Sequence, residues 1–483
     1  MIGLCVLLAC FAALIGGYFL YGRLAEKVYG FDAGMEMPCK SMADGVDYVA
    51  MPVWKVFLIQ LLNIAGLGPV VGALSGCLFG PVALLWIVIG CIFAGALHDF
   101  LAALMSAEYR GANLPEVLGR VMGSTARRFM GIVCVFLLLL VGVVFTMLPA
   151  SMLHALLPTL GWSSLVWGLV ILLYYFLATI LPIQTIIGRI YPIFGGLFLF
   201  MTVGLMVGLP LSGHTVLPEL DVTSNFHPQQ LGIWPMIFVT IACGAISGFH
   251  ATQSPMMVRC LVRASSLRRV FYGAMIVEGM VALIWAAVGL SLRETVFEVN
   301  GESLPLADII LRSPSLAVNE VCRELLGHTG AFLAVLGVVV LAITSGDTAM
   351  RCCRLMTADM FHLPQKKIVS RLALALPIFI LVIIISQLDF STIWRYFGWA
   401  NQTLACLTLW CITLFLRQRS RGYWISLLPA LFMSLMCVTF LLHSPDCRIE
   451  MPLPYATAVG AVLTLGLLLV FLLRRPADKP NQE

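Results

Sequence analysis

The sequence predicts an all-α polytopic membrane protein, with about thirteen transmembrane helices that include an inverted repeat of five plus five helices. Three observations predict this fold: the composition, the spacing of the apolar runs and the placement of the basic residues. The chain of 483 residues is 60% hydrophobic and 11% charged, whereas a soluble domain is roughly 45–50% apolar and about 25% charged. A soluble fold could not cover so much apolar surface. The composition therefore excludes most soluble enzymes, nucleic-acid-binding proteins and disordered proteins.

Apolar runs recur along the whole chain at the length that a bilayer demands, which is about 20 residues. Only the loops 212–231 and 292–329 are long. The first run has neither a basic leading segment nor a clear cleavage site, so we expect a retained helix rather than a signal peptide. The expected helices are 2–22, 54–79, 81–106, 129–157, 161–182, 190–211, 232–258, 269–291, 330–357, 371–388, 392–416, 423–442 and 454–473.

The basic residues fall on one side of this arrangement. Lys and Arg concentrate in the cytoplasmic loops of membrane proteins. This pattern predicts an outer N-terminus and a cytoplasmic C-terminus. The net charge of +5 then reflects the orientation of the chain in the membrane, and we expect no nucleic-acid partner. Of the 29 Lys and Arg residues, the only ones on the other side are Arg293, Arg312, Arg323, Arg395 and Arg448.

The fifteen cysteines lie mostly inside apolar runs, where cysteine behaves as a small hydrophobic residue. No CxxC pair stands beside a matching set of His or Cys, so we expect neither a zinc site nor a disulfide framework. Whether Cys322 and Cys447 pair stays open.

Two of the apolar runs are interrupted near the bilayer midplane. Pro removes a backbone donor from a helix, and Gly lowers the cost of leaving it. Unwound backbone at that depth is tolerated only where protein or a water-filled cavity covers it. One interruption alone would be a packing kink as readily as a site, but two at related positions favour a binding site. The residues concerned are Asn63, Gly66, Gly68 and Pro69 in the first run, and Gly244, Ser247, Gly248, His250 and Pro255 in the second.

The two interrupted runs divide the chain into related halves. The helices of 54–211 form a first set of five, those of 232–416 form a second set, and each set begins with a broken helix. Because five is odd, the second set crosses the membrane in the opposite sense, as in the inverted repeats of secondary transporters. We expect a single transmembrane domain over 1–483, in which 2–22 and the two helices of 423–473 are peripheral.

Ionisable residues inside a membrane are costly and are therefore functional candidates. His98 and Asp99 form either a proton-relay or gating pair, or a structural pair that snorkels to the cytoplasmic interface. Glu278 either couples protons or packs by hydrogen bonding. Asp347 has Arg351 one helical turn later, which favours a satisfied ion pair, with a coupling role as the alternative.

Polar uncharged residues accompany the breaks. Exposed carbonyls bind cations, and helix N-termini bind carboxylates. Asn63, Ser247 and His250 flank the breaks, whereas Asn401 and Gln402 either line the permeation path or join two helices by hydrogen bonds.

Several short sequence motifs follow one another along the chain, and their combination is specific enough to compare with known families. They are 44–48 (DGVDY), 64–69 (IAGLGP), 93–100 (FAGALHDF), 243–251 (CGAISGFHA) and 397–405 (FGWANQTLA). Together, from about residue 40 to 405, they resemble the carbon starvation protein A family, and Thr344, Asp347 and Arg351 match it more loosely. The resemblance implies a bacterial inner-membrane transporter of peptides, with pyruvate–proton import among the relatives, and a fold like that of the leucine transporter LeuT. It also implies that Thr344 and Ser345 hold a cation against the first broken helix, without deciding between sodium and a proton.

We therefore expect a secondary active transporter that imports small peptides, induced in carbon starvation, with a pyruvate or small-carboxylate proton symporter as the alternative. No enzyme motif is present; a channel or a nutrient sensor is less favoured. No resident cofactor or metal is expected beyond a bound sodium ion or a transported proton, and the oligomeric state stays open. The expected substrate-binding residues are Asn63, Gly66, Gly68, Ser247, Gly248, His250, Asn401 and Gln402, and the expected coupling residues are His98, Asp99, Glu278, Thr344, Ser345 and Asp347.

Overall fold

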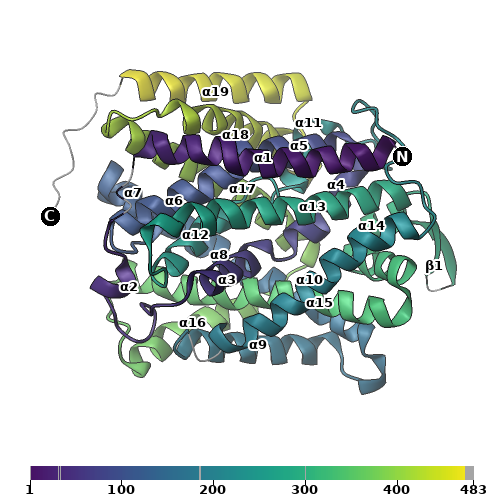
Figure 1. Ribbon diagram of the computed structural model, residues 1–483, viewed down its shortest axis with the longest axis horizontal. Helices are drawn as coiled ribbons and strands as arrows, with labels where there is room; N and C mark the ends of the chain where they lie inside the picture. The colour runs from purple at the N-terminus through teal and green to yellow at the C-terminus, as the bar shows by residue number, and fades with distance from the viewer. Residues whose placement is uncertain (1, 31, 33, 184–186, 300, 474–483) are drawn as a thin grey trace.

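A computed structural model describes residues 2–30, 32, 34–183, 187–299 and 301–473. Its helices lie side by side along the long axis of the molecule (Figure 1). Helices α1 to α10 span Ile2–Tyr29, Pro38–Ser41, Val53–Ala65, Ala73–Gly76, Val82–Gly90, Ala96–Glu108, Leu114–Met122, Ser124–Leu156, Ser164–Ile180 and Ile187–Leu211. Helices α11 to α19 span Ile233–Thr240, Gly248–Val258, Gly273–Leu292, Leu306–Arg312, Pro314–Met360, Ile368–Ile385, Phe390–Gln418, Trp424–His443 and Leu453–Leu473.

Every predicted apolar run is helical, but not every run is one continuous span. Within the described residues, ten helices are long and apolar enough to cross a membrane, and an eleventh forms if the bent pair Val53–Ala65 and Gly68–Phe79 counts as one span. The remaining two runs contain α9, which is shorter, and the interrupted pair α11 and α12. The multi-pass α-helical fold is thus confirmed, and the two broken runs together with the short helix α9 account for the difference in number.

The long loop 292–329 holds structure that the sequence analysis did not predict. A small antiparallel hairpin joins β1 (Val296–Val299) to β2 (Glu302–Pro305). The end of this loop, from Pro314 on, is the first part of α15, which contains one non-helical residue, Gly327, whose φ is +66°. Glycine adopts this left-handed conformation without the steric cost that a side chain brings.

The predicted repeats interlock in space. Helix α3 of the first half packs against α12, α13 and α15 of the second half, and α8 packs against α15 and α17. Helices α1, α18 and α19 lie along the upper edge of the bundle, where α1 contacts α13 and α19 contacts α18 (Figure 1). The centre of the molecule is therefore built from both broken runs, while the boundaries of the two repeats stay a prediction.

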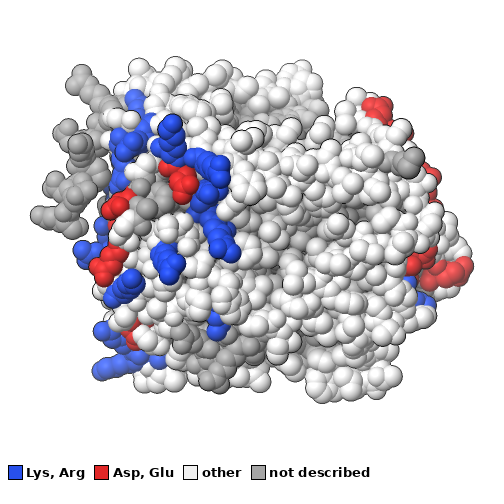
Figure 2. Space-filling model, in the orientation of Figure 1, with Lys and Arg blue, Asp and Glu red and all other residues white. Residues whose placement is uncertain are grey.

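The charged residues gather at the two ends of the helices (Figure 2). Lys and Arg side chains cluster at the end where α2 and α7 lie, acidic side chains dominate the opposite end, and a broad uncharged band separates the two. An apolar band between polar ends is the surface that a lipid bilayer requires.

Candidate functional site

The first break lies at Gly66. Helix α3 ends at Ala65, Gly66 has a φ of +38°, and a π-helical turn begins at Gly68. The two parts of the run are bent by 50°. A Cβ on Gly66 would stand 2.9 Å from the Ser345 hydroxyl oxygen, so the site has room only for glycine.

The second break is longer. Helix α11 ends at Thr240 and α12 begins at Gly248 after a segment that is not regular helix. Within this segment Gly244 has a φ of +89°, and Ser247 is extended and precedes the first turn of α12. A Cβ on Gly248 would stand 2.3 Å from the Asn401 carbonyl oxygen. Both predicted breaks are confirmed as interruptions of the helix.

The two breaks touch each other. A Cβ on Gly68 would lie 2.2 Å from the Cβ of Cys243, and one on Gly72 would lie 2.7 Å from the Thr240 carbonyl oxygen. Small residues let two backbones approach this closely in a membrane. The unwound segments of the two halves thus meet in one buried region.

Hydroxyl groups of α15 face the carbonyls at the end of α3. The Thr344 hydroxyl donates to the Leu62 carbonyl at 2.9 Å, and the Ser345 hydroxyl donates to the Asn63 carbonyl at 2.8 Å. Carbonyls in the last turn of a helix lack helical partners and are free to bind other groups. The two hydroxyl oxygens and the two carbonyl oxygens therefore lie together, where the family resemblance implied that α15 holds a cation against the first broken helix.

Asp347 lies next to this group, on the same helix. Its two carboxylate oxygens accept hydrogen bonds from the hydroxyls of Tyr174 at 2.7 Å and Tyr191 at 2.9 Å. The Tyr191 hydroxyl also lies 3.1 Å from the Asn63 amide oxygen. Tyr174 and Tyr191 were not among the predicted site residues, because nothing in the sequence relates their helices to Asp347.

The predicted ion pair between Asp347 and Arg351 is wrong. Arg351 instead pairs with Asp47, in the loop before α3, at 2.8 Å, and Arg354 lies 3.5 Å from the same carboxylate. Arg351 also donates to the backbone carbonyls of Ala178 and Leu181. A carboxylate from a distant loop accepts from Nη1 of Arg351, and two carbonyls at the end of α9 accept from its Nη2, so neither of these nitrogens pairs with Asp347.

The carboxylate of this ion-pair network belongs to Asp47, which lies in the loop between α2 and α3. Burial raises the pKa of the Asp47 carboxyl, but the guanidinium groups of Arg351, Arg354 and Arg259 outweigh burial and hold that pKa below its ordinary value. The loop before the first broken helix is thereby tied to α15.

His98, Asp99, His250 and Glu278 form one buried chain. His98 Nδ1 lies 2.8 Å from Asp99 Oδ1, and His250 Nδ1 lies 2.9 Å from Asp99 Oδ2. The other ring nitrogen of His250, Nε2, lies 3.6 Å from Glu278 Oε2. All four side chains are fully buried. The alternative in which His98 and Asp99 snorkel to the interface is therefore wrong, and their part in proton transfer stays a prediction.

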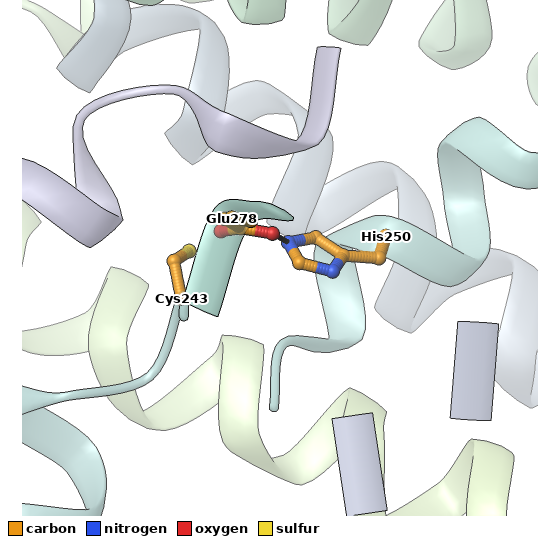
Figure 3. A group of neighbouring side chains, drawn as sticks. All are labelled: Cys243, His250 and Glu278. Carbon is orange, nitrogen blue, oxygen red and sulfur yellow. Dashed lines mark ion pairs between the residues drawn. The ribbon is translucent and has the colours of Figure 1, made fainter. Parts of the chain in front are cut away.

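Cys243 joins the far end of this chain (Figure 3). Its sulfur, a nitrogen of His250 and a carboxylate oxygen of Glu278 all lie within 4.8 Å of one another. Among the described residues, His250 Nε2 and both carboxylate oxygens of Glu278 form no hydrogen bond of standard geometry, and Glu278 faces His250 at 3.6 Å. Proton coupling and packing both stay predictions for Glu278. These three residues could hold a metal ion, which the spacing of residues in the sequence did not indicate.

The predicted amide residues both bind the second broken helix. The Asn401 side-chain oxygen accepts from the Phe249 backbone N–H at 2.8 Å and from the Ser247 hydroxyl at 3.1 Å. The Gln402 side chain donates to the Phe238 carbonyl at 2.5 Å. Hydrogen bonding between helices is therefore confirmed for both, and lining of a permeation path stays a prediction.

Several polar atoms around the breaks are buried without a partner in the described part of the chain. They include the amide nitrogens of Asn63 and Asn401, the side-chain oxygen of Gln402 and both amide atoms of Gln60. Buried polar groups in native proteins normally have partners, so unpaired ones call for a ligand, an ion or water. Gln60 was not among the predicted site residues, although a side-chain amide one helical turn before Asn63 could have indicated it.

Comparison with known proteins agrees with this geometry. The family model for carbon starvation protein CstA matches residues 2–159, 151–310 and 315–440. The peptide transporter CstA of Bacillus subtilis is 26% identical, over 84% of this chain and 83% of its own length. The pyruvate/proton symporter BtsT of Escherichia coli is 26% identical over 57% of this chain and 47% of its own length. An uncharacterized membrane protein of Haemophilus influenzae is 41% identical over 59% of this chain and 90% of its own length.

Solved structures supply the fold. MhsT in complex with L-phenylalanine superposes with a TM-score of 0.58 at 12% identity, over 85% of this chain and 99% of that protein. A mutant of the Eremococcus coleocola manganese transporter superposes with a TM-score of 0.56 at 14% identity, over 89% of this chain and 98% of that protein. These are transporters of the LeuT-like fold, which confirms the predicted architecture. With a family model matched along most of its length and this fold around two broken helices, the chain belongs to the carbon starvation protein CstA family.

Proposed function

We propose that this protein is a secondary active transporter that imports small peptides across the bacterial inner membrane. The observation that carries the proposal is the contact between the two broken helices, at Gly68 and Cys243, among buried polar atoms that lack partners within the described part of the chain. Discontinuous helices that meet at the midplane form the substrate sites of such transporters. The names of relatives, peptide transporter CstA and pyruvate/proton symporter BtsT, support a small organic substrate.

The substrate group recognised at the breaks is a carboxylate. The N-terminus of α12 carries a partial positive charge at Gly248, and the amide N–H groups of Asn63 and Asn401, one from each half, are buried without partners among the described residues. Donors of this kind suit an anionic end group. Both a peptide C-terminus and pyruvate present one, so pyruvate is the second candidate substrate.

Two groups on α15 are the candidate ion carriers. The carbonyls of Leu62 and Asn63 with the hydroxyls of Thr344 and Ser345 provide the hard oxygen ligands that a sodium ion prefers. Asp347, held by two tyrosine hydroxyls and without an ion-pair partner among the described residues, is the carrier if the driving ion is a proton.

The proposed orientation of the chain in the membrane rests on the basic residues. The end that carries most Lys and Arg (Figure 2) faces the cytoplasm by the positive-inside rule. The N-terminus then lies outside and the C-terminus lies in the cytoplasm. An epitope tag at each end, probed in intact and permeabilised spheroplasts, tests this orientation.

The experiment that tests the function is uptake by reconstituted protein. Labelled di- and tripeptides and labelled pyruvate are offered to proteoliposomes under a sodium gradient alone, a proton gradient alone, or neither. We expect accumulation above the outside concentration with one ion gradient and for one substrate class. Uptake that only equilibrates the substrate, at channel-like rates and without an ion gradient, would refute active transport.

A further inference from the structure

The chain of buried groups at the second break ends in three atoms that form no hydrogen bond of standard geometry with the described residues, and two of them face each other at 3.6 Å. The three atoms are His250 Nε2 and the two carboxylate oxygens of Glu278, beside the thiol of Cys243. The three side chains come from three separate pieces of the chain, namely the unwound segment, the first turn of α12 and the second turn of α13 (Figure 3). Their convergence is a property of the packing and not of any local motif.

We propose that Cys243, His250 and Glu278 form a binding site for one divalent transition-metal ion of the zinc type. The inference goes beyond the proposed function and does not depend on it. Sulfur, imidazole nitrogen and carboxylate oxygen are the three donor types that bind zinc in proteins. The thiolate disfavours magnesium, calcium and manganese, which prefer oxygen ligands.

The separations suit a shared metal better than a hydrogen bond. His250 Nε2 lies 3.6 Å from Glu278 Oε2, beyond the range of a good hydrogen bond. Two ligands of one tetrahedral zinc ion, each about 2.0–2.3 Å from the metal, lie roughly 3.3–3.7 Å apart. The three ligand atoms already lie within 4.8 Å of one another, so closure around an ion requires a movement of only about 1 Å.

A second shell is already in place. Asp99 accepts from His250 Nδ1 at 2.9 Å, which leaves Nε2 directed at Glu278 and Cys243. A carboxylate behind a metal-binding histidine fixes the ring and raises its basicity, and His98 in turn holds Asp99 at 2.8 Å. The Ser247 hydroxyl lies 3.5 Å from the Cys243 sulfur.

The charge balance favours a cation. Asp99 and Glu278 are fully buried, and their only ion-pair partners among the described residues are the imidazoles of His98 and His250. A buried carboxylate is costly unless it is paired or bound to a metal. When His250 is neutral, as a metal ligand must be, a divalent ion supplies the positive charge beside Glu278 and ties both the break and α12 to α13.

The test measures metal directly on the full-length protein in detergent. Purified protein is stripped with a chelator, loaded with Zn²⁺ and freed of excess metal, and bound zinc is counted by mass spectrometry. We expect one zinc per chain, a rise in the unfolding temperature on loading, and a near-ultraviolet thiolate-to-metal absorption band when Co²⁺ replaces Zn²⁺. Cys243→Ser and Glu278→Gln should each weaken Zn²⁺ binding at least tenfold, and Cys243→Ser should abolish the Co²⁺–thiolate band.

Cys134→Ser is the matched control, because Cys134 is an equally buried thiol on α8 outside this cluster. It should bind zinc as the wild type does. Asp99→Asn should weaken binding by about 10–100-fold, as second-shell changes do. Absence of stoichiometric zinc from the wild type, or its retention in both Cys243→Ser and Glu278→Gln, would overturn the proposal. If a variant fails to fold, the Co²⁺ spectrum of the wild type still tests the proposal. A wild-type spectrum without a thiolate band would also overturn the proposal. No transport substrate or gradient is used, so this result is independent of the uptake assay.

Discussion

Replacing Asp47 with Asn removes the charge that two buried arginines share. The carboxylate lies 2.8 Å from Arg351 Nη1 and 3.5 Å from Arg354 Nη2, and all three side chains are at most 4% exposed. Breaking a buried ion pair by removing one partner costs about 3–5 kcal/mol, because the other charge stays buried. Arg351 keeps its backbone acceptors at Ala178 and Leu181, which limits the loss. We therefore expect Asp47→Asn to lower the free energy of unfolding by about 3 kcal/mol, the lower end of that range.

The assay is reversible unfolding of the protein in mixed detergent micelles at neutral pH. The matched control is Glu116→Gln, which breaks an exposed pair with Arg120 and should change stability by at most about 1 kcal/mol. If Asp47→Asn proves no less stable than this control, the ion pair does not hold the loop to α15, and the reasoning from burial is refuted.

The same pair fixes the pH dependence of stability. Because the pKa of Asp47 is lowered in the folded protein, its contribution is complete above the unfolded pKa of about 3.9 and is lost as the pH falls through the folded pKa. The stability gap between wild type and Asp47→Asn should therefore be constant from pH 5 to 8 and shrink below about pH 4. A gap that changes around neutral pH would assign the effect to another group.

Three further perturbations test the region between the two broken helices. Ser345→Ala removes one hydroxyl from the candidate cation site, and the loss of about 1.5–3 kcal/mol should raise the half-saturating sodium concentration for uptake roughly tenfold or more. Gly68→Ala places a methyl group 2.2 Å from the Cys243 Cβ, so it should cost about 1–3 kcal/mol of stability and abolish uptake, whereas Gly196→Ala, with no atom within 4 Å, should do neither. Asn401→Ala removes the acceptor at the start of α12 and should cost about 1 kcal/mol of stability, measured by the same unfolding assay.

Each of these has an outcome that contradicts it. Uptake by Ser345→Ala with wild-type sodium dependence would remove this serine from the cation site. Full activity of Gly68→Ala would show that the breaks need no close contact. Asn401→Asp retains an acceptor oxygen, so it should be more stable than Asn401→Ala; equal losses would attribute the effect to packing.

Much of the fold was predictable because its causes are local. The apolar runs mark the helices, since about 20 apolar residues suffice to cross a bilayer wherever they stand. Gly66, Gly68 and Gly244 mark the breaks, because their backbone conformations and close contacts require glycine. The division between α11 and α12 was predictable for the same reason. The length of the unwound segment between them was not, because it depends on which parts of the protein cover that segment.

Partners of charged side chains were not predictable in the same way. One helical turn separates Asp347 from Arg351, yet Arg351 pairs with Asp47, which lies 304 residues away in sequence. Spacing along one helix lists only the neighbours on that helix, whereas a buried guanidinium is satisfied by whatever acceptors the surrounding elements bring to it.

The sequence by itself determined that the protein lies in a lipid bilayer, which segments are helical, and where both breaks lie. Only the tertiary structure decided that the breaks touch, that Tyr174 and Tyr191 hold Asp347, and that Cys243, His250 and Glu278 converge. The physical reason is range. Helix formation and helix breaking depend on a few consecutive residues, whereas hydrogen bonds and ligand geometry depend on atoms within a few ångströms, and packing chooses those atoms from segments that the sequence leaves far apart.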